Sequence, residues 1–315
     1  MSTASMNIPF LSEQALEALN LSVDEIIESI EKLILGAEKN TVWSAPKAVI
    51  MPPDGRYMMA ALAAMDGPSH LAVKTVVLNP ENPDKGLPQI NGLVTMLDSS
   101  SGLPVAILDG NWITAVRTAG LSATAAKHLA NKDASSIGFV GCGVQARSHL
   151  ETFMKMFPIK SAKYFGRGKP NIEKLEDLCS ELGVSVEAAE SGQEAIEDVD
   201  IVVTSITATG GPEPFLDAQG LKTGAFAAIT DLGVPWIKDS FQYLDNVVID
   251  DVAQEMSLPN KLCNPDHISG DISDLVTGKL SVGETQTGRN VFLFRGHALG
   301  DLALSSLALT RFRSQ

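Results

Sequence analysis

The feature that most constrains the fold of this chain is a glycine-rich turn between an apolar strand-like run and a helical segment. Residues 136–140 are apolar, the turn reads G-C-G-V-Q-A over 141–146, and helical spacing continues to about residue 156. The turn fits G-x-G-x-x-A, the alanine form of the dinucleotide fingerprint. Gly141 permits the tight turn, and Gly143 lets a pyrophosphate approach the backbone. The predicted cofactor-binding residues here are Gly141, Cys142, Gly143, Val144, Gln145 and Ala146.

The segments that follow the turn place it in the context that the fingerprint requires. Strand-like runs at 162–165, 184–187 and 201–204 alternate with helical segments at 172–182 and 193–196. This alternation predicts an α/β, Rossmann-type doubly wound parallel sheet, whose ligands gather at the carboxyl ends of the strands. Thr204 and Ser205 lie at such an end and are also predicted to bind the cofactor. A glycine turn without a ligand is the less favoured interpretation.

The end of the second strand of such a sheet usually selects the cofactor. An acidic residue there binds the ribose hydroxyls of NAD, whereas an arginine accommodates the extra phosphate of NADP. This chain has Gly166 and Arg167 at that position and no acidic residue. The cofactor is therefore predicted to be NAD(P), with NADP(H) slightly favoured, although Arg167 as a solvated surface charge is the alternative. Cys142 in the turn is interpreted as a small space-filling residue rather than a nucleophile.

The N-terminal third of the chain has a different pattern. Ser22 and Glu25 form a capping box that opens an amphipathic helix, and turn clusters then separate β-rich runs at 48–51, 71–78, 92–97 and 105–108. A helical segment follows from residue 114 to 129, and the tail combines a strand-like run at 290–294 with a helix-like run at 299–309. These patterns predict an α+β domain of residues 1–115 with 290–315, and a nucleotide-binding domain of residues 116–289.

Composition narrows the classes of partner. Acidic residues outnumber basic ones by 38 to 24, giving a net charge of −14, which argues against nucleic acid. No run approaches the roughly 18 apolar residues of a membrane helix, and no N-terminal run has the pattern of a secretory signal. The three cysteines lie far apart without a C-x-x-C pair, and the five histidines lack metal-ligand spacing. The predictions are a cytoplasmic location, no metal, no membrane and no nucleic acid.

Several blocks of the sequence resemble the ornithine cyclodeaminase/μ-crystallin family. They are V-K-T at 73–75, N-P-E-N-P at 79–83, G-L-P at 86–88, L-D at 97–98, G-L-P-V-A at 102–106, D-G at 109–110, T-A-V-R-T-A at 114–119, the turn at 141–146, V-F at 291–292, Gly296 and D-L-A at 301–303. The resemblance implies that the α+β domain binds substrate and forms a homodimer. It also implies chemistry at the α-carbon of an amino or imino acid.

The resemblance places a catalytic lysine at Lys74, a carboxylate-binding arginine at Arg117 and a catalytic aspartate at Asp231. Lys74 lies within a strand, where burial lowers a lysine pKa into the range useful for proton transfer; the alternative is an outward-facing surface lysine. Arg117 is expected near the start of a helix, where its fork and free amides would bind a carboxylate, or where it would pair with a nearby acid. Asp231 lies near a strand end, and its alternative role is a cap.

The chain departs from the family pattern at two places. Lys47 stands where many relatives have a carboxylate-binding arginine, and it offers a point charge rather than a fork. Residues 230–236 differ from the glycine-rich, charged segment usual in cyclodeaminases, which disfavours ornithine as substrate. His297 is an expected substrate-site residue with a structural role as its alternative. Gln89 is also assigned to the substrate site, and Tyr57, Met58 and Asn91 are further predicted lining residues of that site.

The predicted function is an NAD(P)H-dependent oxidoreductase of a small amino or imino acid: an amino-acid dehydrogenase, or a ketimine or pyrroline-2-carboxylate reductase. Arg117 and Lys47 would orient the substrate carboxylate, and Lys74 and Asp231 would handle the proton on its nitrogen. One alternative is a cyclodeaminase-type lyase that releases ammonia and recycles its NAD. Another is a non-catalytic NADPH or small-ligand binder like some μ-crystallins.

Overall fold

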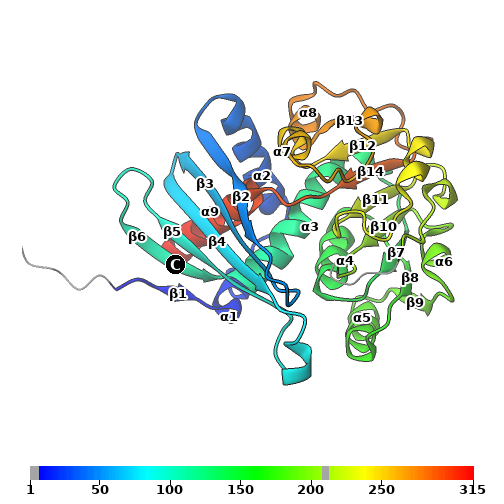
Figure 1. Cartoon of the computed structure of the whole chain (residues 1–315), viewed down its shortest axis with the longest axis horizontal. Coiled ribbons are helices and arrows are strands. Elements are labelled where there is room, and N and C mark those ends of the chain that lie inside the picture. Colours follow the sequence, from blue (N-terminus) through cyan, green and yellow to red (C-terminus); the bar gives the residue numbers. More distant parts are fainter. Residues whose placement is uncertain (1–6, 208–212) are drawn as a thin grey trace, which may run out of the picture. The chain divides into compact units, whose positions relative to one another are not determined.

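The chain folds into two compact units, of which the computed structural model describes residues 7–207 and 213–315 (Figure 1). Unit 1 is built from the residues up to Arg117 and from His297–Gln315, and unit 2 is Thr118–Gly296. The strand at the start of the tail belongs to the sheet of unit 2. The predicted domain boundary at residue 290 is therefore wrong, because it separates this strand from its sheet.

Unit 1 contains a six-stranded sheet in the described part of the chain, with the order β1-β6-β5-β4-β3-β2. The central strands pair antiparallel with their neighbours, and only the short β1 pairs parallel, with β6. The bounds are β1 (Phe10–Leu11), β2 (Val42–Ile50), β3 (Tyr57–Asp66), β4 (Ser69–Leu78), β5 (Ile90–Leu97) and β6 (Pro104–Asp109). Side chains alternate between two faces of such a sheet, so β4 turns His70, Ala72, Lys74 and Val76 to its buried face.

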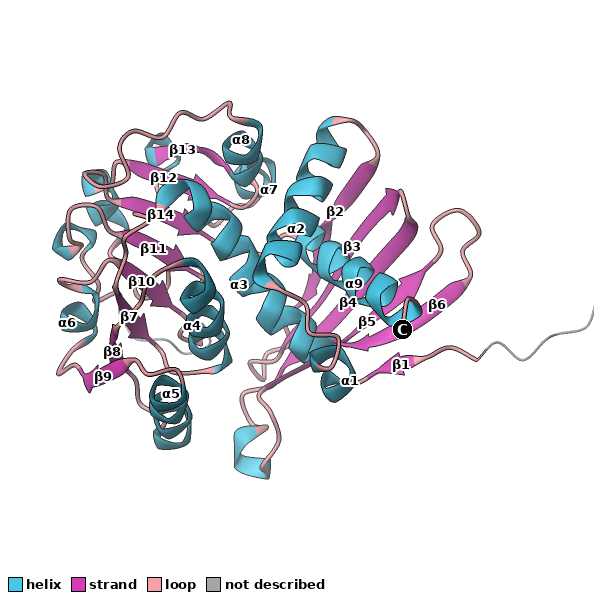
Figure 2. Ribbon diagram, turned by 180° about the vertical axis from the view of Figure 1, so that it is seen from behind, coloured by secondary structure: helices cyan, strands magenta, loops and turns pink. Residues whose placement is uncertain are grey.

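Two long helices, α2 (Val23–Glu38) and α9 (Ala298–Arg313), lie against one face of this sheet (Figure 2). The predicted capping box of Ser22 and Glu25 is present at the start of α2. Helix α9 is buried along most of its length, and the Ser29 hydroxyl donates a hydrogen bond of 3.0 Å to the Ala303 carbonyl, which joins the two helices. The C-terminal helix thus forms the core of unit 1. The short elements of unit 1 are α1 (Glu13–Glu17) and a 3₁₀ turn at Pro83–Lys85.

Unit 2 is the predicted doubly wound α/β fold. Its sheet has the order β13-β12-β14-β11-β10-β7-β8-β9, and each pair is parallel. Chain order reverses between β7 and β10, which is the topological switch point where ligands of such sheets bind. The strands are β7 (Ser136–Val140), β8 (Ser161–Phe165), β9 (Ser185–Ala188), β10 (Ile201–Thr204), β11 (Phe226–Ile229), β12 (Asn246–Ile249), β13 (Ile268–Asp271) and β14 (Asn290–Leu293).

Helices flank this sheet on both sides, with α4 and α6 on opposite faces (Figure 1). The central strands β10, β11 and β14 are buried at every residue. The helical elements are α3 (Gly110–Leu129), α4 (Val144–Met156), α5 (Lys169–Glu181), α6 (Gly192–Ile196), α7 (Val252–Ser257) and α8 (Ile272–Thr277), with 3₁₀ turns at Ala218–Gly220, Lys238–Tyr243 and Pro265–His267. No helix in residues 7–207 or 213–315 is long and apolar enough to cross a membrane.

The structure corrects the predicted start of the helix that carries Arg117. Helix α3 begins at Gly110, because the Asp109 carboxylate accepts hydrogen bonds of 2.9 Å from the amides of Asn111 and Trp112. Arg117 therefore lies inside the helix, where backbone amides are already bonded within the helix. The expectation that free helix amides would assist Arg117 is therefore wrong.

Candidate functional site

The glycine turn of unit 2 has the geometry that its sequence predicts. Gly141 has φ of +97°, and a Cβ at this position would lie 2.8 Å from the Ser205 carbonyl oxygen, so only glycine fits. Gly143 is the N-cap of α4, and a Cβ there would meet no atom within 4 Å. The backbone of Gly143 therefore borders open space at the start of a 13-residue helix. Amides at such a helix start attract anions.

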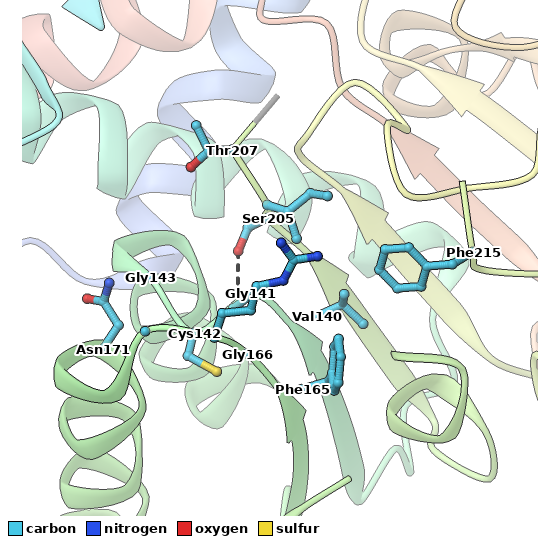
Figure 3. A pocket seen from close by; sticks show the side chains of 13 residues that line it. Val140, Gly141, Cys142, Gly143, Phe165, Gly166, Asn171, Ser205, Thr207 and Phe215 are labelled. Atoms are coloured by element: carbon cyan, nitrogen blue, oxygen red, sulfur yellow. Dashed lines mark hydrogen bonds between the residues drawn. The ribbon is translucent and has the colours of Figure 1, made fainter. Parts of the chain in front are cut away.

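A pocket of about 320 Å³ opens above this turn, at the switch point between β7 and β10 (Figure 3). Its floor is the turn itself, and one side is formed by the loop after β8. The loop after β10 forms another side, and there the Ser205 hydroxyl lies 3.5 Å from the Gly141 carbonyl oxygen. The lining residues are Val140, Gly141, Cys142, Gly143, Phe165, Gly166, Arg167, Gly168, Asn171, Ser205, Ile206, Thr207 and Phe215.

Six of the predicted cofactor residues line this pocket: Gly141, Cys142, Gly143, Gly166, Arg167 and Ser205. Val144, Gln145 and Ala146 form the first turn of α4. Thr204, also a predicted cofactor residue, does not line this pocket. Thr204 is fully buried and absent from the lining, because its hydroxyl binds protein groups instead.

The cysteine in the turn packs against the loop after β8. A Cβ on Gly166 would lie 2.6 Å from the Cys142 sulfur, so Gly166 makes room for the thiol. Burial raises the pKa of Cys142 to about 11, which is opposite to the low pKa that activates a thiol. The structure therefore supports a space-filling role for Cys142.

Asp231 lies just after the end of β11, and its side chain is buried. Its Oδ1 accepts a hydrogen bond of 3.0 Å from the Thr204 hydroxyl, and its Oδ2 accepts one of 3.1 Å from the Ile206 amide. Burial raises the pKa of Asp231 to about 6, against the lowering effect of these hydrogen bonds. A carboxyl group with this pKa can exchange a proton near neutral pH.

Unit 1 holds a second cluster, built on a buried lysine. The Lys74 ammonium lies 2.7 Å from Oδ1 of Asp301, and Nε of Arg117 lies 3.0 Å from the same oxygen. All three side chains are at most 6% exposed. The three charged groups come from β4, α3 and α9, and two cations share one carboxylate. These three side chains together carry a net charge of +1 when Lys74 is protonated.

The surroundings of Lys74 make it easier to deprotonate than an ordinary lysine. Burial lowers its pKa to about 8, and the charges of Arg117 and Lys47 act in the same direction, whereas Asp301 opposes them. Lys47 in β2 is thus close enough to act on Lys74, as the predicted substrate site requires. The alternative of an outward-facing Lys74 is wrong, because the side chain points to the buried face of the sheet.

His297 and Gln89, two of the remaining predicted substrate residues, make hydrogen bonds with groups outside this cluster. His297 caps α9, with its Nδ1 accepting a hydrogen bond of 3.0 Å from the Leu299 amide, which supports its structural alternative. Gln89 lies just before β5, and its carbonyl accepts a hydrogen bond of 2.9 Å from the Asn79 amide. Gln89 in the substrate site remains a prediction, as do Tyr57 and Met58 in β3 and Asn91 in β5.

Asp301 is the site residue that sequence reasoning missed. It lies in the first turn of α9, where a negative charge is favoured by the helix dipole. The available signal was a carboxylate within the apolar first two turns of the helix, together with a lysine that shares the alternation of buried positions in β4. A buried lysine needs a counter-charge, and Asp301 supplies it.

The chain is similar to proteins of one enzyme family. The sequence profile of the ornithine cyclodeaminase/mu-crystallin family matches residues 9–312. An alanine dehydrogenase of Archaeoglobus fulgidus is 26% identical over 96% of this chain and 94% of its own length. Ketimine reductase mu-crystallin of Rattus norvegicus is 30% identical over 82% of this chain and 80% of its own.

Solved structures share the fold across both units. The Δ1-pyrroline-2-carboxylate reductase of Thermococcus litoralis, solved with NADH and L-proline, is 26% identical and has a TM-score of 0.86 over 98% of each chain. An archaeal alanine dehydrogenase solved as a dimer with NAD is 23% identical, with a TM-score of 0.84 over 98% of this chain and 97% of that one. The two-unit arrangement of secondary structure is thus that of nicotinamide-dependent relatives.

Proposed function

The chain belongs to the ornithine cyclodeaminase/mu-crystallin family, and on this premise we propose that it is an NAD(P)H-dependent oxidoreductase acting at the α-carbon of a small amino or imino acid. The observation that carries this proposal is the buried group of Lys74, Arg117 and Asp301, with two cations on one carboxylate. Such a group suits a substrate that brings its own carboxylate and an ionisable nitrogen. The relatives that act on alanine, ketimines and pyrroline-2-carboxylate have substrates of this kind.

The pocket of unit 2 fits a nicotinamide dinucleotide. Gly141 and Gly143 shape the turn, and the start of α4 at Gly143 borders open space where phosphate groups would bind. The bound cofactor would supply the hydride for the α-carbon. Arg167 lines the same pocket, and no acidic side chain is among its described lining residues. These features support a preference for NADP(H) over NAD(H).

The residues of the chain would bind and orient the substrate and handle its proton. Arg117 and Lys47 would hold the carboxylate, which fixes the position of the α-carbon. Reduction of an imine adds a hydride to carbon and a proton to nitrogen. Lys74 and Asp231 would supply or accept that proton, because their pKa values of about 8 and about 6 bracket neutral pH.

We further propose that the chain forms a homodimer through the open face of the unit 1 sheet. Leu62 and Leu93 lie on this face, because they pair with Val73 and Thr75, which alternate with the inward-facing Lys74. Trp43 and Val77 are also exposed there. Contiguous exposed apolar side chains on one sheet face are typical of an interaction surface, and a symmetric dimer would cover this one.

An absorbance screen with amino acids and cyclic imines, run with both reduced and both oxidised cofactors, tests the proposed activity. We expect a net change at the absorbance of the reduced nicotinamide with at least one small substrate. Release of ammonium without net cofactor turnover would instead indicate the cyclodeaminase-type lyase. Tight nucleotide binding without turnover of any substrate would indicate a binding protein.

A further inference from the structure

The carboxyl group of Asp231 is held at both oxygens by groups of unit 2. Oδ1 accepts from the Thr204 hydroxyl at 3.0 Å, and Oδ2 accepts from the Ile206 amide at 3.1 Å. Both donors come from the end of β10 and the residues just after it, on the strand next to β11. The position of this side chain is therefore set by two separate bonds rather than by packing alone.

The backbone after Asp231 adds a further constraint. Leu232 and Gly233 both adopt left-handed conformations, with φ of +61° and +68°. Leucine rarely adopts this conformation, which costs roughly 1–2 kcal/mol. The Val234 amide donates to the Asp231 carbonyl at 3.2 Å, and the Trp236 amide donates to the Gly233 carbonyl at 3.0 Å. This turn brings the Trp236 side chain back to the same strand end.

The hydrogen bonds of the Thr204 hydroxyl have a defined direction when Asp231 is ionised. The indole Nε1 of Trp236 lies 3.2 Å from Thr204 Oγ1, and an indole N–H can only donate. Thr204 therefore accepts from Trp236, and its single proton is donated to the Asp231 carboxylate, which when ionised can only accept. Both Thr204 and Trp236 are fully buried, so water does not compete for these bonds. The bonds run in one fixed order, from Trp236 to Thr204 to Asp231.

We propose that Trp236 and Thr204 are positioning residues for Asp231, and that their fixed relay of hydrogen bonds orients its carboxylate and favours its ionised form. This inference rests on the proposed function, in which Asp231 handles the proton of the substrate nitrogen. It also explains why Thr204 is a buried residue at the cofactor end of the sheet without lining the pocket. The hydroxyl serves the proton-transfer group rather than the nucleotide.

Two basic side chains on neighbouring elements have partners other than Asp231. Arg295, which follows β14 beside β11, pairs with Glu255, and Lys238 donates to the Lys261 carbonyl. The principal influences on the pKa of Asp231 are its burial, which raises the pKa, and hydrogen bonds, which lower it; none is an ionised side chain. Removal of one hydrogen bond should therefore have a measurable effect on the titration of this group.

Substitution of Thr204 tests the relay directly. Thr204→Val keeps the shape of the side chain and removes the hydroxyl, so the pKa of Asp231 should rise from about 6 by roughly one unit. Thr204→Ser should restore the wild-type value. Trp236→Phe frees the hydroxyl to turn away and should shift the pKa in the same direction by a smaller amount. The readout is ¹³C NMR titration of the aspartate carboxyl in the protein without nucleotide, assigned with Asp231→Asn.

Two controls separate the relay from general damage. Thr277→Val removes a hydroxyl that bonds the Ser273 carbonyl in α8, far along the chain from Asp231, and should leave the titration unchanged. Thermal unfolding reports whether each variant is folded. If Thr204→Val does not fold, the test becomes a comparison of the Asp231 pKa in Trp236→Phe with that in Thr204→Ser. An unchanged Asp231 titration in the folded variants would overturn the relay.

Activity measurements distinguish this failure from a failure of the proposed function. With an active substrate, the acid limb of kcat/KM should move to higher pH in Thr204→Val, together with the Asp231 titration. A moved limb and a moved titration support the relay as a device for proton transfer. If the NMR titration moves while Asp231→Asn retains full turnover, the relay is present and the catalytic assignment of Asp231 is wrong.

Discussion

Lys74 and Arg117 bind the same oxygen of Asp301, at 2.7 and 3.0 Å, inside unit 1. Two buried cations therefore share one carboxylate oxygen. The pKa of Lys74 falls to about 8 although Asp301 raises it, because burial and Arg117 outweigh the carboxylate. The charge balance of this cluster has direct consequences for stability and for the pH range of activity.

Replacement of Asp301 by asparagine should strongly destabilise the protein. Asn keeps the size of the side chain but removes the carboxylate charge that both Lys74 and Arg117 bind, and breaking a buried ion pair in this way costs about 3–5 kcal/mol in comparable pairs. The measurement is urea unfolding at pH 7. Glu28→Gln on α2 is the matched control, because Glu28 is exposed and its loss should change the free energy of unfolding by less than about 0.5 kcal/mol. Equal stability of the two variants would contradict the proposed role of Asp301.

The pH dependence of kcat/KM should be bell-shaped. Asp231 must lose its proton to act as a base, so activity should fall as the pH drops through about 6. Lys74 must keep its proton to act as a donor, so activity should fall as the pH rises through about 8. Residual turnover of Asp231→Ala should lack the acid limb, and that of Lys74→Ala should lack the alkaline limb. A profile that both variants leave unchanged would show that other groups titrate.

Much of unit 2 could be predicted from the sequence, because its elements are set by local patterns. The apolar strand of residues 136–140, the turn at Gly141 and the helix after it appear where the fingerprint places them. The strand of residues 201–204 also has the predicted bounds. Each of these elements combines a continuous apolar run with glycine or polar boundaries, and that combination is visible without knowledge of tertiary contacts.

Strand β3 was not predicted, because its local propensity conflicts with its environment. Residues 57–66 are rich in alanine and methionine, which favour helices. The structure pairs this strand with β2 on one side and β4 on the other, and these two ladders override the local preference. The pairing of β14 was also not predicted. This strand lies between β11 and β12 in the sheet but far from both along the chain.

The charge clusters were predictable only in part. Lys74, Arg117 and Asp231 were proposed from family resemblance, but their partners lie far away along the chain. Asp301 is more than two hundred residues from Lys74 in sequence, and Thr204 meets Asp231 only because β10 and β11 are neighbours. A sequence pattern gives the strand end at which such a residue lies, whereas the partner depends on strand order and helix packing.

Gly143→Ala should weaken nucleotide binding without loss of stability. A Cβ at Gly143 meets no protein atom within 4 Å, and its φ is −75°, so the folded protein accommodates alanine. The added methyl group would occupy space that the cofactor needs at the start of α4, and we expect at least a tenfold loss of affinity, about 1.4 kcal/mol. Quenching of protein fluorescence by NADPH measures binding, and thermal unfolding measures stability.

Gly283→Ala is the control for this substitution. A Cβ at Gly283 also meets no atom within 4 Å, and Gly283 does not line the pocket. This variant should bind NADPH as the wild type does. If Gly143→Ala binds with unchanged affinity, the pyrophosphate does not lie against this turn, and the assignment of the pocket to a dinucleotide fails.

Arg167→Asp should reverse the preference between the two cofactors. The arginine lines the pocket beside the end of β8 and would pair with the extra phosphate of NADP(H), whereas an aspartate would repel it and bind ribose hydroxyls instead. We expect the ratio of kcat/KM for NADPH to that for NADH to fall by roughly 10- to 100-fold, consistent with loss of one charge-assisted contact. Lys174→Asp, an equal charge change on exposed α5, should leave the ratio unchanged. A wild-type preference for NADH, or an unaltered ratio in Arg167→Asp, would show that Arg167 is a surface charge.

Charge placed on the open face of the unit 1 sheet should dissociate the proposed homodimer. Leu62 and Leu93 are 40% and 44% exposed on this face, and a glutamate at both positions would put four like charges into a symmetric interface. Burial of unpaired charges is costly, so Leu62→Glu/Leu93→Glu should be monomeric at micromolar concentration by light scattering while the wild type is dimeric. Leu35→Glu alters a leucine with similar exposure on α2, which covers the other face, and should remain dimeric. A wild type that is monomeric, or a double variant that stays dimeric, would place the interface elsewhere or remove it.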